Sequence, residues 1–317
     1  MSAGYKILVT GACGQIGTEL VKALRKVHGD SNVIASDIRD RCQACSENYY
    51  ALNVLNETAM DWLVSHLGIT QIYHLAAVLS YSGEQRPVPA WDLNMTGLLN
   101  VLEIARKHKL EKVFWPSSIA IFGPGSMPAV CFQSSKADPL TVYGISKLAG
   151  EYWCRYYTEH YGLDIRSIRY PGLISHSAPA GGGTTDYAVD IFHQALARGI
   201  YNCYLRENTA LPMMYMADAI RATLQLMAAP KEQLTIRESY NLSALSFTPA
   251  ELAAEIKKHL PLQVFYRPDH RQAIADSWPQ SINDRQARSD WGWQPAYDLE
   301  KMVTEMIGEL KKQHAYA

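Results

Sequence analysis

The chain has 317 residues, 48% of them hydrophobic, and a formal net charge of −1 at pH 7. Its length suffices for a full hydrophobic core with an appended lobe, and its balanced charge gives no basis for binding nucleic acid or an anionic membrane surface. No apolar run is long enough to span a bilayer, and an apolar segment that begins at Tyr5 leaves no room for a leader peptide, so we expect a cytoplasmic protein.

The first predicted strand, residues 5–9, runs through a glycine-rich turn into a predicted helix over 18–27. Gly11, Gly14 and Gly17 have the spacing G-x-x-G-x-x-G, which lets the backbone turn tightly, approach a pyrophosphate and pack the helix against the strand. The helix N-terminus then faces the phosphates with its partial positive charge. The pattern predicts a dinucleotide site.

A second predicted strand, residues 33–37, ends in Asp37, 20 residues after Gly17. An acid at this place binds the ribose diol and repels a 2′-phosphate, so NAD is favoured over NADP. Arg39 weakens this preference without reversing it.

A third predicted strand covers residues 71–77, and the small residues Ala76 and Ala77 at its end would let a cofactor pass close to the backbone. We interpret His74 as a packing residue, because a histidine inside a strand is more often buried and satisfied than catalytic. A helix over 91–108, opened by Asp92, follows it.

The fourth predicted strand, residues 112–115, delivers Ser118 to its carboxyl end, where α/β folds gather ligands. In the next predicted helix, residues 143–160, Tyr143 and Lys147 are four apart and share a face, so the ammonium can favour the phenolate. An isolated Tyr-x-x-x-Lys would more often be helix surface. The dinucleotide pattern upstream favours the catalytic interpretation.

A fifth predicted strand, residues 164–170, completes an alternation that predicts an α/β fold: a Rossmann-type, doubly wound parallel sheet. Beyond Gly172 the alternation fails. Here we predict helices over 187–198, 249–259 and 299–311, a strand over 213–216, a helix capped by Asp218 that runs to Ala228, and a loop region containing Trp278, Trp291 and Trp293.

Two domains are predicted from this pattern. Residues 1–172 and 211–240 form the NAD-binding domain, and residues 173–210 and 241–317 form a smaller, discontinuous α/β substrate-binding lobe.

Six cysteines are scattered along the chain, and Cys42-x-x-Cys45 is the only close pair. Since a structural zinc site needs a second pair, we expect reduced thiols and no metal site.

Together the glycine pattern, Ser118, Tyr143-x-x-x-Lys147 and residues 169–172 resemble the extended short-chain dehydrogenase/reductase superfamily over essentially the whole chain. Four further segments closely resemble the short-chain type of L-threonine 3-dehydrogenase within that superfamily: 171–175, 181–188, 211–215 and 273–279.

The resemblance implies NAD as the cofactor. Where many extended members carry an aspartate that holds adenine, this chain has Asn53, whose amide can still hydrogen-bond an adenine edge. The expected cofactor contacts are Gly11, Gly14, Gln15, Ile16, Gly17, Asp37, Asn53, Val54, Leu75, Ala76, Ala77, Asn94, Tyr143, Lys147 and Tyr170.

The resemblance further implies NAD-dependent oxidation of the β-hydroxyl of L-threonine to L-2-amino-3-oxobutyrate, in threonine catabolism toward glycine or aminoacetone. Tyr143 would be the general base, Ser118 would hydrogen-bond the same oxygen, and Lys147 would bind the nicotinamide ribose and lower the pKa of the phenol. A tyrosine base makes a catalytic metal unnecessary.

The substrate carboxylate is expected at residues 181–185, whose backbone N–H groups and threonine hydroxyls can form an anion-binding concavity. A flexible linker is the alternative interpretation of three consecutive glycines. The expected substrate contacts are Ser80, Ser118, Tyr143, Gly183, Thr184, Thr185 and Trp278.

Two other functions remain open. A nucleotide-sugar epimerase or dehydratase of the same superfamily would typically carry an asparagine where this chain has Gly172, and a dehydratase would add an acidic pair beside Ser118. A redox sensor or scaffold that binds NAD without turning it over would not need Ser118, Tyr143 and Lys147 together.

Extended members commonly dimerise through two helices, so we predict a homodimer formed by residues 91–108 and 143–160. Leu98, Leu102, Tyr152 and Tyr156 are compatible with such an interface.

Overall fold

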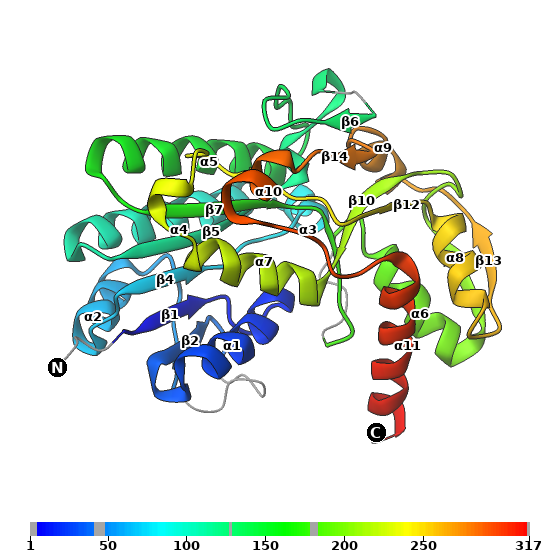
Figure 1. Ribbon diagram of the computed structural model, residues 1–317, viewed down its shortest axis with the longest axis horizontal. Helices are drawn as coiled ribbons and strands as arrows, with labels where there is room; N and C mark the ends of the chain where they lie inside the picture. The colour runs from blue at the N-terminus through cyan, green and yellow to red at the C-terminus, as the bar shows by residue number, and fades with distance from the viewer. Residues whose placement is uncertain (1–4, 41–47, 127–128, 178–182, 316–317) are drawn as a thin grey trace.

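A seven-stranded parallel sheet forms the centre of the computed structural model, which describes residues 5–40, 48–126, 129–177 and 183–315 (Figure 1). Its strands are β1 (Ile7–Thr10), β2 (Val33–Asp37), β3 (Tyr49–Ala51), β4 (Gln71–His74), β5 (Lys112–Ser118), β7 (Ile165–Tyr170) and β11 (Tyr240–Asn241). They lie in the order β11-β7-β5-β4-β1-β2-β3, and every neighbouring pair is parallel. The predicted Rossmann-type α/β fold is confirmed.

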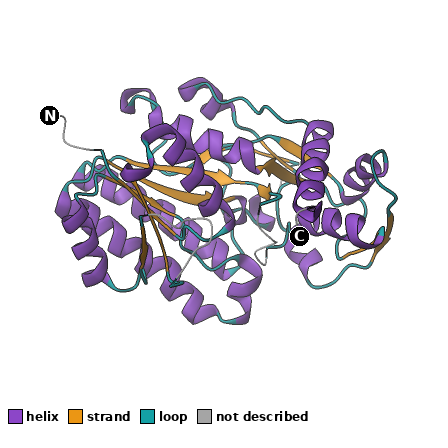
Figure 2. Ribbon diagram, turned by 90° about the horizontal axis from the view of Figure 1, so that it is seen from below, coloured by secondary structure: helices purple, strands orange, loops and turns teal. Residues whose placement is uncertain are grey.

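Helices cover both faces of this sheet, as Figure 2 shows. On one face lie α1 (Gln15–His28) and α7 (Met216–Ala228), and on the other lie α2 (Glu57–Leu67), α4 (Pro87–His108) and α5 (Val142–Tyr161). The alternation within β1 sets the two cores: Ile7 and Val9 pack with the first pair of helices, and Leu8 packs with the second group. Strands buried on both faces are continuously apolar, as this one is.

Most of the rest of the chain packs beyond the carboxyl ends of the strands, at the right in Figure 1, whereas Ala287 and Trp293 pack in the core of the main sheet. A smaller sheet joins β8 (Gly172–Ile174), β10 (Leu211–Tyr215) and β12 (Leu245–Phe247). Its helices share a separate apolar core. They are α6 (Tyr187–Arg198), α8 (Pro249–Lys257) and α11 (Leu299–Ala315). Two parallel strand pairs complete it: β9 (Ile200–Cys203) with β13 (Gln263–Tyr266), and β6 (Val130–Cys131) with β14 (Ser281–Ile282).

The boundaries differ from the predictions at several places. The predicted loop between α8 and α11 contains β13, α9 (Arg271–Asp276), β14 and α10 (Arg285–Trp291). Helix α4 begins at Pro87, four residues before its predicted start, because proline is well suited to the first helical turn. A short helix that was not predicted, α3 (Ser80–Gln85), precedes it.

The prediction that Asp218 caps α7 is wrong, because the helix already begins at Met216. The Asp218 side chain is fully buried, and its carboxylate accepts hydrogen bonds from the backbone N–H groups of Ala296 and Tyr297 and from the guanidinium of Arg221. It therefore ties the segment that leads into α11 to the first turn of α7.

Some predictions fall outside the described residues: the pair Cys42 and Cys45, and Gly181 and Gly182 of the glycine tract. Within the ranges that the structure covers, no helix is both long and apolar enough to cross a membrane. In the same ranges, no group of three or more His, Cys, Asp or Glu side chains could hold a metal ion.

Candidate active site

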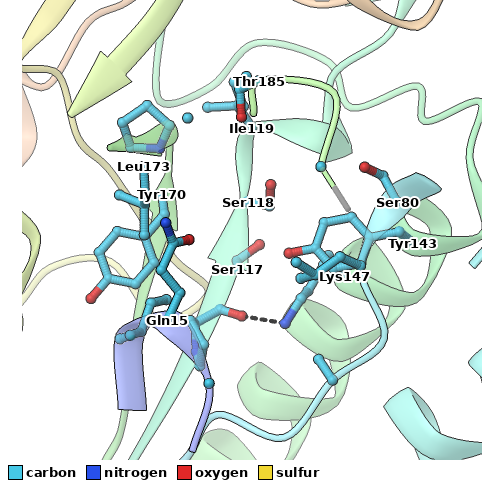
Figure 3. Close-up of a pocket in the computed structure, with 18 of the residues that line it drawn as sticks. Gln15, Ser80, Ser117, Ser118, Ile119, Tyr143, Lys147, Tyr170, Leu173 and Thr185 are labelled. Atoms are coloured by element: carbon cyan, nitrogen blue, oxygen red, sulfur yellow. Dashed lines mark hydrogen bonds between the residues drawn. The ribbon is translucent and has the colours of Figure 1, made fainter. Parts of the chain in front are cut away.

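A cleft lies at the carboxyl ends of the central strands, between the parallel sheet and the smaller sheet (Figure 3). It has an empty volume of about 1040 Å³, counting the part that is open to solvent. The predicted site residues that line it are Gly11, Gly14, Gln15, Ile16, Gly17, Leu75, Ala77, Ser80, Ser118, Tyr143, Lys147, Tyr170, Gly183, Thr184, Thr185 and Trp278. Residues far apart in the sequence are thus brought to one place.

The glycine turn between β1 and α1 leaves no room for side chains. Gly11 has φ +72°, and a Cβ atom there would lie 2.6 Å from the backbone nitrogen of Ala76. A Cβ at Gly17 would lie 2.3 Å from the carbonyl oxygen of Gly11. The bare backbone can therefore approach a ligand closely at the N-terminus of α1, which fits a pyrophosphate.

Gln15 supplies independent support for a polar ligand beside this turn. It is the first residue of α1 and lines the cleft (Figure 3), and its buried Nε2 has no hydrogen-bond partner. A buried amide donor left without a partner costs free energy, so a bound acceptor would satisfy it. The residues present fit a dinucleotide such as NAD.

Asp37 stands at the end of β2 beside the turn. Its carboxylate accepts hydrogen bonds from the backbone N–H groups of Cys13 at 3.1 Å and of Arg39 at 3.3 Å. The Arg39 guanidinium lies 3.9 Å from the same carboxylate. The acid thus lies next to the turn although outside the main cleft, and its contact with the ribose stays a prediction.

Tyr143 and Lys147 lie on the first turns of α5, which begins after the Thr141 side chain caps the N–H of Gly144. Figure 3 shows both side chains facing the end of β5, where Ser118 lies. Lys147 Nζ donates to the Pro116 carbonyl at 2.6 Å. It also lies 5.5 Å from the centre of the Tyr143 ring.

Burial dominates the acid–base behaviour of this pair. It raises the pKa of Tyr143 to about 12, and a hydrogen bond with Ser118 lowers that pKa by less. Burial also lowers the pKa of Lys147 to about 7. The expectation that Lys147 depresses the pKa of the phenol is wrong for the protein's own residues, because the ammonium is bonded to the Pro116 carbonyl instead of facing the phenol oxygen.

The loop before α6 provides polar groups on the opposite wall of the cleft. Thr184 is fully buried, and its Oγ1 has no hydrogen-bond partner. The Gly183 N–H donates to the Asp186 carboxylate at 2.7 Å. The prediction that this N–H faces the substrate carboxylate is therefore wrong. The hydroxyls of Thr184 and Thr185 remain as donors on that wall.

Two more predicted substrate residues close the cleft. Ser80 is the first residue of α3 and is 4% exposed, and Trp278 follows α9 and is 7% exposed. They come from segments on either side of the cleft, which places the cleft between the two parts of the chain.

Besides Asp37, four predicted cofactor contacts lie outside the lining of the cleft. Asn94 is buried, and its amide bonds both backbone groups of Val78 and the Ser146 hydroxyl. Asn53 accepts from the N–H of Leu55 in an exposed loop. The remaining two are Val54, which packs in a core, and Ala76, whose backbone abuts Gly11.

His74 is buried as predicted, but only one ring nitrogen has a partner among the described residues, since its Nε2 makes no hydrogen bond. It is 1% exposed, its Nδ1 lies 2.8 Å from the Thr10 hydroxyl, and burial lowers its pKa to about 3. The ring is therefore neutral near pH 7.

Several residues that line the cleft were not predicted, among them Ser117, Gly172 and Asp186. Ser117 and Asp186 each adjoin a predicted residue in the sequence, and Gly172 was noted only as the position where nucleotide-sugar enzymes carry an asparagine. Both adjacent serines line the cleft, and the sequence pattern does not reveal that the Ser117 hydroxyl bonds Glu151.

Comparison with known proteins gives the family. The family model described as the NAD dependent epimerase/dehydratase family matches residues 7–243. In solved structures, the chain is similar to a GalE-like L-threonine dehydrogenase from Cupriavidus necator in its holo form, with 55% identity and a TM-score of 0.93 over 96% of this chain and 99% of that one.

Two further relatives are similar along nearly the whole chain. A structure described as a monomeric L-threonine 3-dehydrogenase from a metagenome database, in its apo form, is 47% identical with a TM-score of 0.93, over 97% of this chain and 99% of that one. The mitochondrial L-threonine 3-dehydrogenase of Bos taurus is 47% identical over 310 residues, which are 95% of this chain and 82% of that protein.

Proposed function

Because this chain belongs to the NAD dependent epimerase/dehydratase family, we propose that it is an NAD-dependent L-threonine 3-dehydrogenase, which oxidises the β-hydroxyl of L-threonine to L-2-amino-3-oxobutyrate. One observation carries the proposal: the glycine turn, the Ser118–Tyr143–Lys147 set and the buried threonines of the loop before α6 line a single cleft. The relatives named above support the choice of substrate.

In this proposal Tyr143 accepts the proton of the β-hydroxyl, and the Ser118 hydroxyl donates to the same oxygen as it becomes a carbonyl. Lys147, held by the Pro116 carbonyl, lies beside the phenol and would bind the nicotinamide ribose. When bound, NAD would supply the acceptor for the hydride that leaves carbon 3, and its positive charge would favour the phenolate. The Ser118 hydroxyl already acts against the effect of burial on the pKa of Tyr143.

The threonine carboxylate is assigned to the hydroxyls of Thr184 and Thr185. Since Thr184 Oγ1 is fully buried and lacks a partner, an anionic oxygen in the cleft would satisfy it. Ser80 and Trp278 then limit the size of the substrate from the two sides.

The surroundings of Gly172 favour a small substrate over a nucleotide sugar. A Cβ atom at this position would lie 2.5 Å from Met213 Sδ and 2.7 Å from a methyl carbon of Thr185. An asparagine of the kind that nucleotide-sugar enzymes carry here would not fit without displacing the Thr185 side chain. The preference for NAD over NADP is likewise proposed, on the position of the Asp37 carboxylate beside the turn.

The test is the formation of NADH, followed by its absorbance, with L-threonine, L-serine or UDP-glucose as the second substrate. We expect turnover with L-threonine and none with UDP-glucose. Interconversion of UDP-glucose and UDP-galactose, with no NADH from L-threonine, would replace this function with that of an epimerase.

A further inference from the structure

One face of α5 carries three residues, spaced four apart, that lie against the end of β5. Tyr143, Lys147 and Glu151 are four residues apart, so they form a single stripe along the helix. Two of them hydrogen-bond the strand end: Lys147 bonds the Pro116 carbonyl, and Glu151 bonds the Ser117 hydroxyl. The pKa of the third, Tyr143, is raised by burial and lowered by less by the Ser118 hydroxyl.

Glu151 is the innermost member of this stripe and is 1% exposed. Its Oε1 accepts from the Ser117 hydroxyl at 2.5 Å and from Arg169 Nε at 2.8 Å. Its Oε2 accepts from Arg169 Nη2 at 2.7 Å. Such a two-pronged pairing fixes the carboxylate in both position and orientation.

Arg169 is itself fixed from a third direction. It is 8% exposed, and its remaining nitrogen donates to Asn241 Oδ1 at 3.0 Å and to the Gln133 carbonyl at 3.3 Å. The pair therefore links β7, β11 and α5 beneath the strand end. A buried ion pair seldom stabilises a fold more than apolar side chains of the same volume would, but it does impose a defined geometry.

We propose that Glu151 is a positioning residue for the oxidation: held by Arg169, it fixes the Ser117 hydroxyl and thereby the strand end that presents Ser118 to Tyr143 and the Pro116 carbonyl to Lys147. The inference rests on the proposed function for its catalytic consequence. Its structural part, the alignment of the strand end by Glu151, stands on the contacts alone.

Ser117 is the link through which this device acts. It lies between the residue that holds Lys147 and the residue that faces Tyr143, so a shift of its backbone moves both. Displacements of about 1 Å at a catalytic site can cost on the order of 10²-fold in rate. The rate of the chemical step should therefore depend on the Ser117 hydroxyl.

The test compares Ser117→Ala with a matched control, Ser167→Ala. Ser167 lies on the neighbouring strand β7, beside Trp115, and both serines are 2% exposed. The Ser167 hydroxyl bonds Ser239 and does not line the cleft. We expect Ser117→Ala to lower kcat at least about tenfold, with the KM for L-threonine and the affinity for NADH changed less than about twofold. Ser167→Ala should keep the wild-type kcat.

Crystal structures of the same two variants provide a readout that needs no substrate. The distance between Lys147 Nζ and the Pro116 carbonyl, 2.6 Å in the parent chain, should lengthen in Ser117→Ala and stay unchanged in Ser167→Ala. Glu151→Gln keeps an acceptor for Ser117, so its kcat should lie closer to that of the wild type than the kcat of Glu151→Ala does. Should both Glu151 variants fail to fold, the comparison of Ser117→Ala with Ser167→Ala still tests the positioning role.

A wild-type kcat and an unchanged strand end in Ser117→Ala would overturn the positioning role, as would equal losses in both serine variants. If the wild-type protein makes no NADH from L-threonine, the proposed function fails separately. The crystallographic comparison then still accepts or rejects the alignment of the strand end by Glu151.

Discussion

Tyr143 is a phenol at the head of α5, and burial raises its pKa to about 12. A base of this kind works only if the negative charge that it carries as a phenolate is compensated nearby. The Ser118 hydroxyl contributes to that compensation, and in the proposed mechanism the positive charge of bound NAD would add to it. The phenol oxygen is therefore the atom whose removal should stop the reaction and leave the cleft intact.

We predict that Tyr143→Phe lowers kcat by at least ~10², the usual value of general-base assistance, while NADH binds as tightly as to the wild type. The control is Tyr152→Phe, which removes a phenol from the half-exposed surface of the same helix. Steady-state kinetics and NADH fluorescence titration measure the two effects. Comparable kcat values for Tyr143→Phe and the wild type would remove the tyrosine from the mechanism.

Lys147 makes the stability of the fold depend on pH in a defined window. Burial lowers its pKa from 10.5 to about 7, so between these values the unfolded chain binds a proton that the folded chain does not. The free energy of unfolding should then rise with pH across this window, by at most about 1.4 kcal/mol per pH unit. Below pH 7 the lysine is protonated in both states, so the stabilisation gained across the window is absent there.

Urea unfolding of the wild type and of Lys147→Met from pH 7 to 9.5 measures this contribution. Buried tyrosines and cysteines with raised pKa values act in the opposite direction, and they are common to both proteins, so the difference between the two curves isolates the lysine. We expect the stability of the wild type relative to the variant to increase with pH. A constant difference would show that the lysine is charged in the folded state throughout.

At the scale of single residues, the sequence predicted the members of the site better than their orientation. The spacing of Tyr143 and Lys147 was enough to place both on one helix face. It could not reveal that Lys147 would bond the Pro116 carbonyl, or that the Gly183 N–H would turn toward Asp186, since both depend on packing between segments distant in the chain.

Among the elements, the turn between β1 and α1 is the most tightly constrained. Gly11 needs a positive φ and also close contact with the strand end at Ala76. These two requirements can be separated, because Gly68 has a similar φ of +64° and no neighbouring atom within 4 Å of an added Cβ.

We predict that Gly11→Ala and Gly68→Ala both lose roughly 1 kcal/mol of stability from the backbone, since alanine disfavours positive φ. Only Gly11→Ala should also weaken NADH binding, by at least about tenfold, because its methyl group would push the turn away from the ligand. Urea unfolding and fluorescence titration check this. Equal NADH affinities for the two variants would argue that the turn does not contact the cofactor.

Five of the seven strands of the main sheet were predicted because each is a short apolar run, but β3 and β11, of three and two residues, were not. The short elements between α8 and α11 were not predicted either, because strands of two to four residues and helices of six or seven carry too few residues to show a period. Trp293 illustrates this: it is fully buried, and its indole N–H donates to Asp284 and to the Ser243 carbonyl, contacts that only the folded chain brings together.

For the whole molecule, the dimer remains a prediction, and the structure changes which residues would form it. Leu98 and Leu102 pack in the chain's own core and are fully buried, so they cannot reach a partner. Tyr152, Trp153 and Tyr156 on α5 are 52%, 39% and 41% exposed and form an apolar surface there. Exposed apolar patches of this kind commonly mark interfaces.

Sedimentation at micromolar concentration should therefore give the mass of two chains, and Trp153→Glu should give the mass of one. Trp62→Glu is the control, since Trp62 is 56% exposed on α2, outside this surface. One relative is described as monomeric, so a single-chain mass for the wild type is the outcome that would refute the dimer.

The central claim is that carbon 3 of L-threonine loses a hydride while Tyr143 takes the proton of its hydroxyl. L-Threonine carrying deuterium at carbon 3 tests it most directly, with the coenzyme product examined by mass spectrometry. We predict that the deuterium appears in the reduced nicotinamide. Its release into water, or its retention in the amino-acid product, would contradict the claim.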